Sequence, residues 1–375
     1  MADTPARPSV RPHGGPAGAD VLQAEMRDFT DMVPADRPRA QPMRGFDPEY
    51  TDIVDYIVRC THRIWDERNV GLIYTHYTHN AVVYSPLGTV YDREEVVRAT
   101  IQRIAEFPDR RGMATQVIWS GNEDDGFYSS HLVTSAGRHT EPGPLGPPTG
   151  RSFVMRTIAD CLVFENRIYR EWLVRDSYAM YRQLGVDIPA LAEKAAKGLL
   201  DRGTVITDLG ETGHRLGQYP PGDAADLSLA RTDSERACLG WMHEVWNRRM
   251  FGQLRAAMAP DVRWHGPGMR EAAGVASVTA QCVKLAAAMP DLAFTPQHIC
   301  SVPCVEGGEK IAVRWIMHGH HLGWHAAMGA PSGAPLALMG MNHFHVVDGR
   351  IIDDWTVYDE FSLMVQAALS RLAAA

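Results

Sequence analysis

The pattern of apolar and polar positions predicts the same succession of elements twice along the chain. In the second half, apolar residues three and four positions apart predict helices at 234–249, 251–258 and 276–289. Short apolar or alternating runs predict strands at 262–265, 310–319, 337–347 and 350–357. Asp348-Gly349 supplies a tight turn between the last two strands, and a final helix is expected over 360–373. Helices that precede an antiparallel sheet predict an α+β fold, with the helices packed on one face of the sheet.

The first half follows the same order. Helices are expected at 50–68, 70–77 and 93–107, with a strand at 81–84. Residues 62–68 return as 243–249, an offset of 181 positions, and residues 166–176 return as 349–359, an offset of 183 positions. A nearly constant offset over a whole segment indicates two copies of one domain.

The repeat divides the chain into four parts. Residues 1–45 are rich in Pro, Gly, Ala and Arg and are expected to form a flexible arm. The first domain is expected over 46–186 and the second over 233–375. Residues 187–232 are expected to form a helical and polar linker between them. Each repeat, at roughly 140 residues, is long enough to bury its own core.

Composition is that of an ordinary globular protein and argues against some partners. Apolar residues make up 45% of the chain and charged residues 22%. A net charge of −8 without a basic stripe argues against nucleic acid, and no apolar run approaches the ~20 residues of a bilayer span, so no membrane partner is expected. The first residues lack the apolar stretch of a secretory signal, which predicts a cytoplasmic protein with reduced cysteines. Cys300 and Cys304 form a close pair, but no second pair completes a zinc site.

Several short motifs occur in the same order in both repeats. In the second they are Met289-Pro290-Asp291, 311–315, Pro331-Ser332-Gly333 and 348–359. In the first they are Phe107-Pro108-Asp109, 148–151 and 166–176. Together they resemble the SnoaL-like (polyketide cyclase-like) branch of the nuclear transport factor 2-like superfamily, over most of the chain. The resemblance implies two tandem cone-shaped α+β barrels, each with helices packed on a curved antiparallel sheet around an apolar pocket.

The resemblance also implies a range of chemistry. Related folds include cyclases, isomerases, dehydratases, epoxide hydrolases and proteins without chemistry. A pocket of low polarity raises the pKa of a carboxyl group towards neutrality, which suits proton transfer next to a carbonyl. Members of this fold usually work without a metal, so neither a metal nor an organic cofactor is expected.

In the second repeat, strand alternation puts Met339, Met341, His343 and His345 on one face of the penultimate strand. SnoaL-type cyclases pair a histidine with an aspartate in this region, and the match falls on His345 and Asp359. An imidazole beside a carboxylate is a workable acid–base pair, with His343 as an orienting or oxyanion-stabilising group. The alternative is that these side chains are partly solvated residues at strand ends.

In the first repeat the corresponding positions differ. Asp160 and Asp176 occupy the places of a histidine and of the terminal aspartate, and Arg156 lies on the same face as Asp160. His131, which takes the place of Arg314, is expected to face the same cavity. An arginine between two aspartates resembles the Asp-Arg-Asp arrangement of epoxide hydrolases, which predicts a second or a degenerate active site. The alternative is an ion pair between Arg156 and Asp160 that holds the strands together.

Histidines and tryptophans concentrate in the second repeat. The histidines on or near its strands are His318, His320, His321, His325, His343 and His345. Imidazoles on adjacent strands could converge on a metal, although the resemblance argues against one. Trp264, Trp315 and Trp324 have no tryptophan counterpart in the first repeat and are expected to line a pocket for a planar ligand. The remaining expected substrate-binding residues are Met341, Tyr84 and His265.

These observations predict a cofactor-independent acid–base enzyme of the cyclase, isomerase or dehydratase/lyase type. Its substrate is expected to be a hydrophobic small molecule that bears a carbonyl group, and the second repeat is expected to carry the chemistry. One alternative is a non-catalytic ligand-binding or assembly module. Another is an epoxide-hydrolase-like hydrolase that uses the first repeat. The two repeats are expected to pair as an internal pseudo-dimer, within a monomer or a homodimer.

Overall fold

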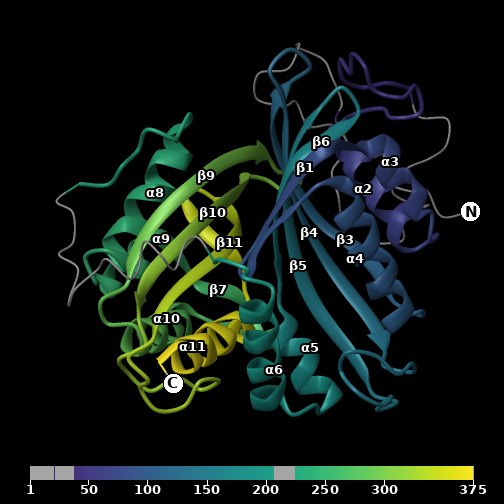
Figure 1. Cartoon of the computed structure of the whole chain (residues 1–375). Coiled ribbons are helices and arrows are strands. Elements are labelled where there is room, and N and C mark those ends of the chain that lie inside the picture. Colours follow the sequence, from purple (N-terminus) through teal and green to yellow (C-terminus); the bar gives the residue numbers. More distant parts are fainter. Residues whose placement is uncertain (1–20, 22–37, 207–223, 375) are drawn as a thin grey trace, which may run out of the picture.

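Two α+β units follow one another along the chain (Figure 1). The computed structural model describes residue 21, residues 38–206 and residues 224–374. Most of the arm predicted over 1–45, and the linker segment 207–223, lie outside the described residues. Within the described ranges, none of the helices combines the length and apolar character that a membrane crossing requires.

The elements of the two units correspond one to one. The first unit contains α2 (Ile53–Trp65), α3 (Ile73–His76), β1 (Tyr77–Ser85), β2 (Gly88–Tyr91), α4 (Arg93–Glu106), β3 (Arg111–Asn122), β4 (Gly126–Arg138), β5 (Ser152–Phe164), β6 (Arg167–Arg175) and α5 (Ser177–Leu184). α6 (Ile188–Asp201) follows it. The second unit contains α8 (Asp233–Trp246), α9 (Leu254–Ala257), β7 (Met258–Gly266), β8 (Arg270–Ala273), α10 (Val275–Ala288), β9 (Ala293–Pro303), β10 (Glu309–His320), β11 (Pro335–Val347), β12 (Arg350–Tyr358) and α11 (Glu360–Ala374).

Each unit has one six-stranded sheet, and the predicted α+β fold is confirmed. The strand orders are β2-β1-β6-β5-β4-β3 and β8-β7-β12-β11-β10-β9. The sheets are mixed, not wholly antiparallel as predicted, because β1 pairs with β6 and β7 pairs with β12 in parallel. Hairpin turns impose antiparallel pairing only on successive strands, whereas β1 and β6 are joined through a helix and three further strands. The pattern also missed β9, because Pro296 and a bulge interrupt its alternation.

Local signals at the helix ends agree with the structure. The Asp52 side chain accepts the backbone N–H of Asp55 at the start of α2. At the start of α8, Thr232 and Glu235 form a capping box, in which each side chain binds the other residue's backbone N–H. These caps fix where the first helix of each unit begins.

Both faces of each sheet are covered. Helices pack on one face, here called the helix face. The other, here called the inter-unit face, packs against the partner unit, where six apolar side chains form one cluster: Leu132, Ile158, Val174, Met339, Met341 and Val357. At the bottom of Figure 1, α6 and α5 of the first half lie beside α11. Successive residues of β12 therefore alternate between the helices and the first unit.

Candidate functional site

The second unit encloses a cavity of about 500 Å3 between its helix face and helices α8, α9 and α10. Most of the lining is apolar or aromatic, including Trp241, Trp246, Trp264, Trp315, Leu254 and Leu285. A volume of several hundred Å3 with a few convergent polar groups is typical of small-molecule sites.

A single carboxyl group on the sheet, Asp354 of β12, lines this cavity together with Asn342 and Thr356. Asn342 Nδ2 and Thr356 Oγ1 each donate a hydrogen bond to Asp354 Oδ1, both at 2.8 Å. Within the described part of the chain, Oδ2 accepts no hydrogen bond. Burial raises the pKa of Asp354 to about 6, although these two hydrogen bonds lower it. The carboxyl is therefore held by one oxygen and can exchange a proton near neutral pH through the other.

Two of the cavity tryptophans orient this group. Trp315 Nε1 donates to Asn342 Oδ1 at 2.7 Å, so the amide nitrogen of Asn342 must face Asp354. Trp264 Nε1 donates to Thr356 Oγ1 at 3.2 Å. The indoles thus serve two purposes, because their rings line the cavity while their N–H groups fix the neighbours of the carboxyl.

A charged pair and an exposed indole lie further along the lining. Arg270 binds both carboxylate oxygens of Glu360, at 3.0 and 2.6 Å. Trp324 and His325 come from the loop after β10, and Trp324 is 68% exposed although it lines the cavity. This indole is therefore placed where a ligand would enter.

The first unit has a smaller cavity, of about 280 Å3, in the corresponding place. Glu171 occupies in β6 the position that Asp354 occupies in β12, immediately before the repeated tryptophan. Tyr77 Oη donates to Glu171 at 2.9 Å, and burial raises the pKa of this carboxyl group as well. Each unit therefore directs one buried carboxyl group into its own cavity, from the equivalent position of β6 or β12.

The structure does not bring together His345 and Asp359, the predicted acid–base pair. In the β11–β12 hairpin, which contains one register shift, His345 pairs with Asp353 while Gly340 pairs with Tyr358. Asp359 therefore lies six residues further along, about 20 Å away. Its Oδ1 accepts the backbone N–H groups of Tyr178 and Phe361, both at 3.1 Å. The predicted pairing is wrong because it disregarded the hairpin register.

Four other predicted catalytic residues lie on or beside the inter-unit face. His343 Nε2 lies 2.7 Å from Ser130 Oγ of the first unit. Asp160 accepts from Arg314 Nη1 at 3.0 Å and from Tyr128.

The other two also contact the second unit. Arg156 donates to the Gly266 carbonyl oxygen at 3.2 Å and pairs with Glu271. Asp176 accepts from the Gly268 N–H at 2.7 Å. The Asp-Arg-Asp arrangement is thus spread over separate contacts, Asp160 pairs with Arg314 instead of Arg156, and none of these residues lines either cavity.

The prediction assigned the polar face of β11 to the pocket, and this was the wrong face. Alternation separates two sets of side chains but does not state which layer covers each set. Nearly every residue of β11 is buried, because one face meets helices and the other meets the first unit. Burial lowers the pKa of His343 to about 3, so it is a neutral hydrogen-bonding group within this contact.

The predicted substrate-binding residues divide in the same way. Trp264, Trp315 and Trp324 line the cavity of the second unit. Met341 and Tyr84 belong to the apolar cluster between the units, and the His265 ring stacks on Trp355 at 3.8 Å between centroids.

His131 lines the cavity of the first unit, where burial lowers its pKa to about 4. Its predicted equivalence with Arg314 is wrong by one position. The strand register instead aligns Arg314 with Leu132.

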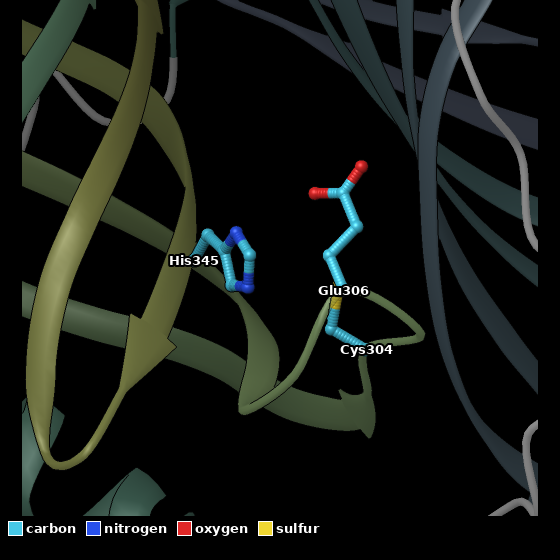
Figure 2. Close-up of side chains that lie close together, drawn as sticks. All are labelled: Cys304, Glu306 and His345. Carbon is cyan, nitrogen blue, oxygen red and sulfur yellow. The ribbon is translucent and has the colours of Figure 1, made fainter.

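The histidines of the second unit do not converge on one point. His320 pairs with Asp291 at 2.6 Å, and His325 lies 3.6 Å from Glu360. Among the described residues, the group able to hold a metal is Cys304, Glu306 and His345, drawn in Figure 2. Hydrogen bonding to His345 and the charge of Lys310 outweigh burial and lower the pKa of the Cys304 thiol.

Asp354, Asn342, Thr356 and Glu171 were missed by the sequence analysis. One signal for them was present in the repeat, because an acidic residue directly precedes the tryptophan at the end of both copies. The partners of Asp354 could not be found in this way, since Asn342 reaches it across the sheet.

Comparison with known proteins matches the second unit to one family. Residues 236–367 match the model of the family described as SnoaL-like polyketide cyclase. Among curated proteins, none matches this sequence.

The solved structures that match this chain each align with a part of it about as long as one unit. A protein of Jannaschia sp. CCS1, assigned to the SnoaL-like polyketide cyclases, is 19% identical with a TM-score of 0.33, covering 37% of this chain and 96% of its own. IdmH of Streptomyces antibioticus is 22% identical with a TM-score of 0.31, covering 36% and 98%. TsrD of Streptomyces laurentii is 21% identical with a TM-score of 0.32, covering 37% and 98%.

The family match spans α8 to α11 except for the first and last few residues, and so includes the whole cavity-forming part of the second unit. The first unit repeats its strand order and its parallel pair. Residues 236–367 are thus similar to the SnoaL-like polyketide cyclases, and the first unit has the same strand order as this matched region.

Proposed function

We propose that the second unit is a cofactor-independent acid–base catalyst that moves a proton next to the carbonyl group of a hydrophobic small molecule. The observation that carries this proposal is Asp354, a buried carboxyl group in an aromatic cavity of about 500 Å3. A catalytic base works best when its pKa is near the operating pH, and burial brings Asp354 close to it.

The contacts of Asp354 suggest how it acts. Asn342 and Thr356 hold Oδ1, so Oδ2 is the oxygen that would accept a proton from the carbon next to a carbonyl. Loss of that proton gives an enolate, which can then cyclise, isomerise or eliminate. The family match to polyketide cyclases supports a polycarbonyl substrate, and the flat tryptophan walls would favour a planar one.

The competing function is a non-catalytic binding cavity in the same place. The assay therefore measures proton abstraction directly, without requiring the natural substrate. Wild-type protein is incubated in D2O with a panel of aryl ketones and 1,3-diketones, together with molecules extracted from the purified protein, and deuterium incorporation is followed by NMR. We expect exchange by the wild type and a loss of at least 100-fold in Asp354→Asn.

Asp353→Asn is the matched control, because the neighbouring carboxylate points away from the cavity and binds Arg263 and His265. It should retain exchange. Equal exchange by wild type and Asp354→Asn would refute the assignment of the base. Binding without exchange across the whole panel would favour the non-catalytic cavity.

A further inference from the structure

The cavity of the first unit has a lining with more positive than negative groups. Arg103, Arg110 and Arg175 line it, against one carboxyl group, that of Glu171. Arg103 is compensated elsewhere, because it pairs with Glu106 at 3.1 Å. The other two arginines have no carboxylate within ion-pair distance among the described residues.

Arg175 is the clearest case. Its side chain lies at the end of β6 on the same face as Glu171, and within the described ranges its guanidinium forms neither a hydrogen bond nor an ion pair. Burial, followed by the charge of Arg103, lowers the pKa of Arg175 to about 10. Arg175 is partly buried, and removing an unpaired guanidinium from water costs free energy, so a counterion is expected to stabilise it.

Other polar atoms around this cavity also lack partners. Arg110 donates to Ser135 Oγ at 2.7 Å, but its Nη1 is buried and unpaired. His131 Nε2 and Thr157 Oγ1 are likewise buried without a hydrogen bond, and both residues line the cavity. Buried polar groups are nearly always satisfied, so several unpaired ones around one cavity indicate a missing polar occupant.

The rest of the lining is apolar, with Ile57, Ile64, Ile73, Val83, Val90 and Met155 among its members. The volume of about 280 Å3 is roughly twice that of an engineered cavity of ~150 Å3 that binds benzene. An occupant therefore has an apolar body of modest size and one anionic end.

The equivalent position in the second unit contains a different residue. Arg175 pairs with Thr157, and Tyr358 pairs with Gly340 in the matching register, so Tyr358 stands where Arg175 stands. The two cavities thus share a carboxyl group at one strand position, Glu171 or Asp354, but an arginine at the position of Arg175 occurs in the first alone. We propose that the first cavity is a binding site for a small apolar carboxylate, with Arg175 as its counterion and Arg110 as a further donor.

The test compares an acid with its neutral analogue on the full chain. Binding of benzoate and of benzyl alcohol is measured by calorimetry and by thermal shift, for wild type, Arg175→Met and Arg170→Met. Arg170 is the control because it lies on the same strand but is exposed. Phenyl phosphate is included to distinguish a carboxylate site from a site for any oxyanion.

We expect benzoate to bind the wild type and Arg170→Met equally, and Arg175→Met at least tenfold more weakly. Benzyl alcohol should not distinguish the three proteins. Without ligand, Arg175→Met should melt at a higher temperature than the wild type, because it removes an unpaired, partly buried charge. Equal benzoate affinity in wild type and Arg175→Met would overturn the proposal, as would a lack of benzoate binding to the wild type or tighter binding of phenyl phosphate than of benzoate.

An independent cluster lies outside both cavities, at the turn between β9 and β10 (Figure 2). Cys304 and Glu306 belong to this turn, and His345 comes from β11, with one ligand atom of each lying within 4.8 Å of the others. The turn is closed by hydrogen bonds from the Cys304 N–H to the Gly308 oxygen at 2.9 Å and from the Gly307 N–H to the Cys304 oxygen at 3.0 Å. Two of the three side chains are therefore carried by an ordered backbone.

The imidazole is already oriented as in a metal site. His345 Nε2 donates to the Gly307 carbonyl oxygen at 2.8 Å, which leaves Nδ1 as the nitrogen able to bind a metal. Histidine ligands of metals usually donate their other N–H to a carbonyl or carboxylate in this way. Thiolate, imidazole and carboxylate are the ligands that zinc takes in proteins. The geometry points to a zinc site at Cys304, His345 and Glu306, with the exposed Glu306 closing on the ion.

Equilibrium dialysis against Zn2+, followed by metal analysis, tests this site. The wild type is expected to bind one ion, and Cys304→Ser and His345→Ala to bind at least tenfold more weakly. Cys282→Ser is the control, since its thiol lines the cavity of the second unit and is not part of this cluster. Unchanged affinity in Cys304→Ser, or less than one ion per chain at saturation, would overturn the assignment. Cobalt-substituted protein adds an optical readout, because thiolate coordination gives a charge-transfer band that Cys304→Ser should lose.

Discussion

Replacing Asp354 by Asn should make the protein more stable at alkaline pH, and the size of this effect follows from its surroundings. Asn retains the oxygen that accepts from Asn342 and Thr356, so the two hydrogen bonds to Oδ1 persist. The substitution removes only the ability to ionise. In the wild type, the pKa of Asp354 is about 6 when folded, against ~3.9 in an unfolded chain.

The sign follows from proton binding. Between these two pKa values the folded protein holds the proton more tightly than the unfolded chain, so wild-type stability falls as pH rises from about 4 through about 6. About two pKa units correspond to about 3 kcal/mol, fully expressed above pH 7. For a unit of this size that is a rise in melting temperature of roughly 6–12 °C. Below pH 4 the two proteins should be equally stable.

Urea unfolding at pH 4, 6 and 8, followed by tryptophan fluorescence, measures this difference. Asp353→Asn should behave in the opposite way. Burial raises the pKa of Asp353, but hydrogen bonds from His265 and Arg263 outweigh it and lower the pKa overall. That carboxylate stabilises the fold above its unfolded pKa, and its removal should destabilise the protein at pH 8 and have little effect at low pH. The reasoning would be refuted if Asp354→Asn did not raise the free energy of unfolding at pH 8, or if it raised it equally at all three pH values.

Two further substitutions test the assignments made at the contact between the units. Burial, and then the charge of Asp176, raise the pKa of Asp359 to about 7. Asp359→Asn should therefore stabilise the protein at pH 8 and leave deuterium exchange intact. Loss of deuterium exchange in this variant would restore Asp359 as a catalytic candidate. Ser130→Ala should lower the free energy of unfolding in urea by about 1–3 kcal/mol, because it leaves His343 Nε2 buried without a partner. Ser129→Ala is the control and should lower it little, because the Ser129 hydroxyl is already unpaired. Equal effects of the two substitutions would contradict this distinction.

The fold and the tryptophans of the second cavity could be predicted from the sequence, but its carboxyl group, Asp354, could not. Hydrophobic spacing and the repeat predicted two α+β domains, and the unmatched tryptophans predicted three side chains that line the second cavity. The same reasoning selected Asp359 and passed over Asp354, five residues earlier. Asp354 lies in the middle of β12 and Asp359 directly follows its last residue, and nothing in the local sequence states which of the two carboxyl groups faces the helices.

Pairing across the sheet was the other limit. Asp354 depends on Asn342, twelve residues away, and the His345–Asp359 pair failed because the hairpin turn at 348–349 sets a different register. Register depends on the turn and on the packing of whole strands, so it is fixed only when the sheet forms.

By itself, the sequence determined the duplicated α+β architecture, because periodicity, turn residues and the repeated tryptophans are local properties of the chain. Only the tertiary structure decided which side of each sheet became a cavity. In a strand with both faces buried, alternation yields two equivalent sets of side chains, and the layer packed against each set determines its role. Here the partner unit covers the face with His343 and Asp160, and the helices enclose the face with Asp354 and Glu171.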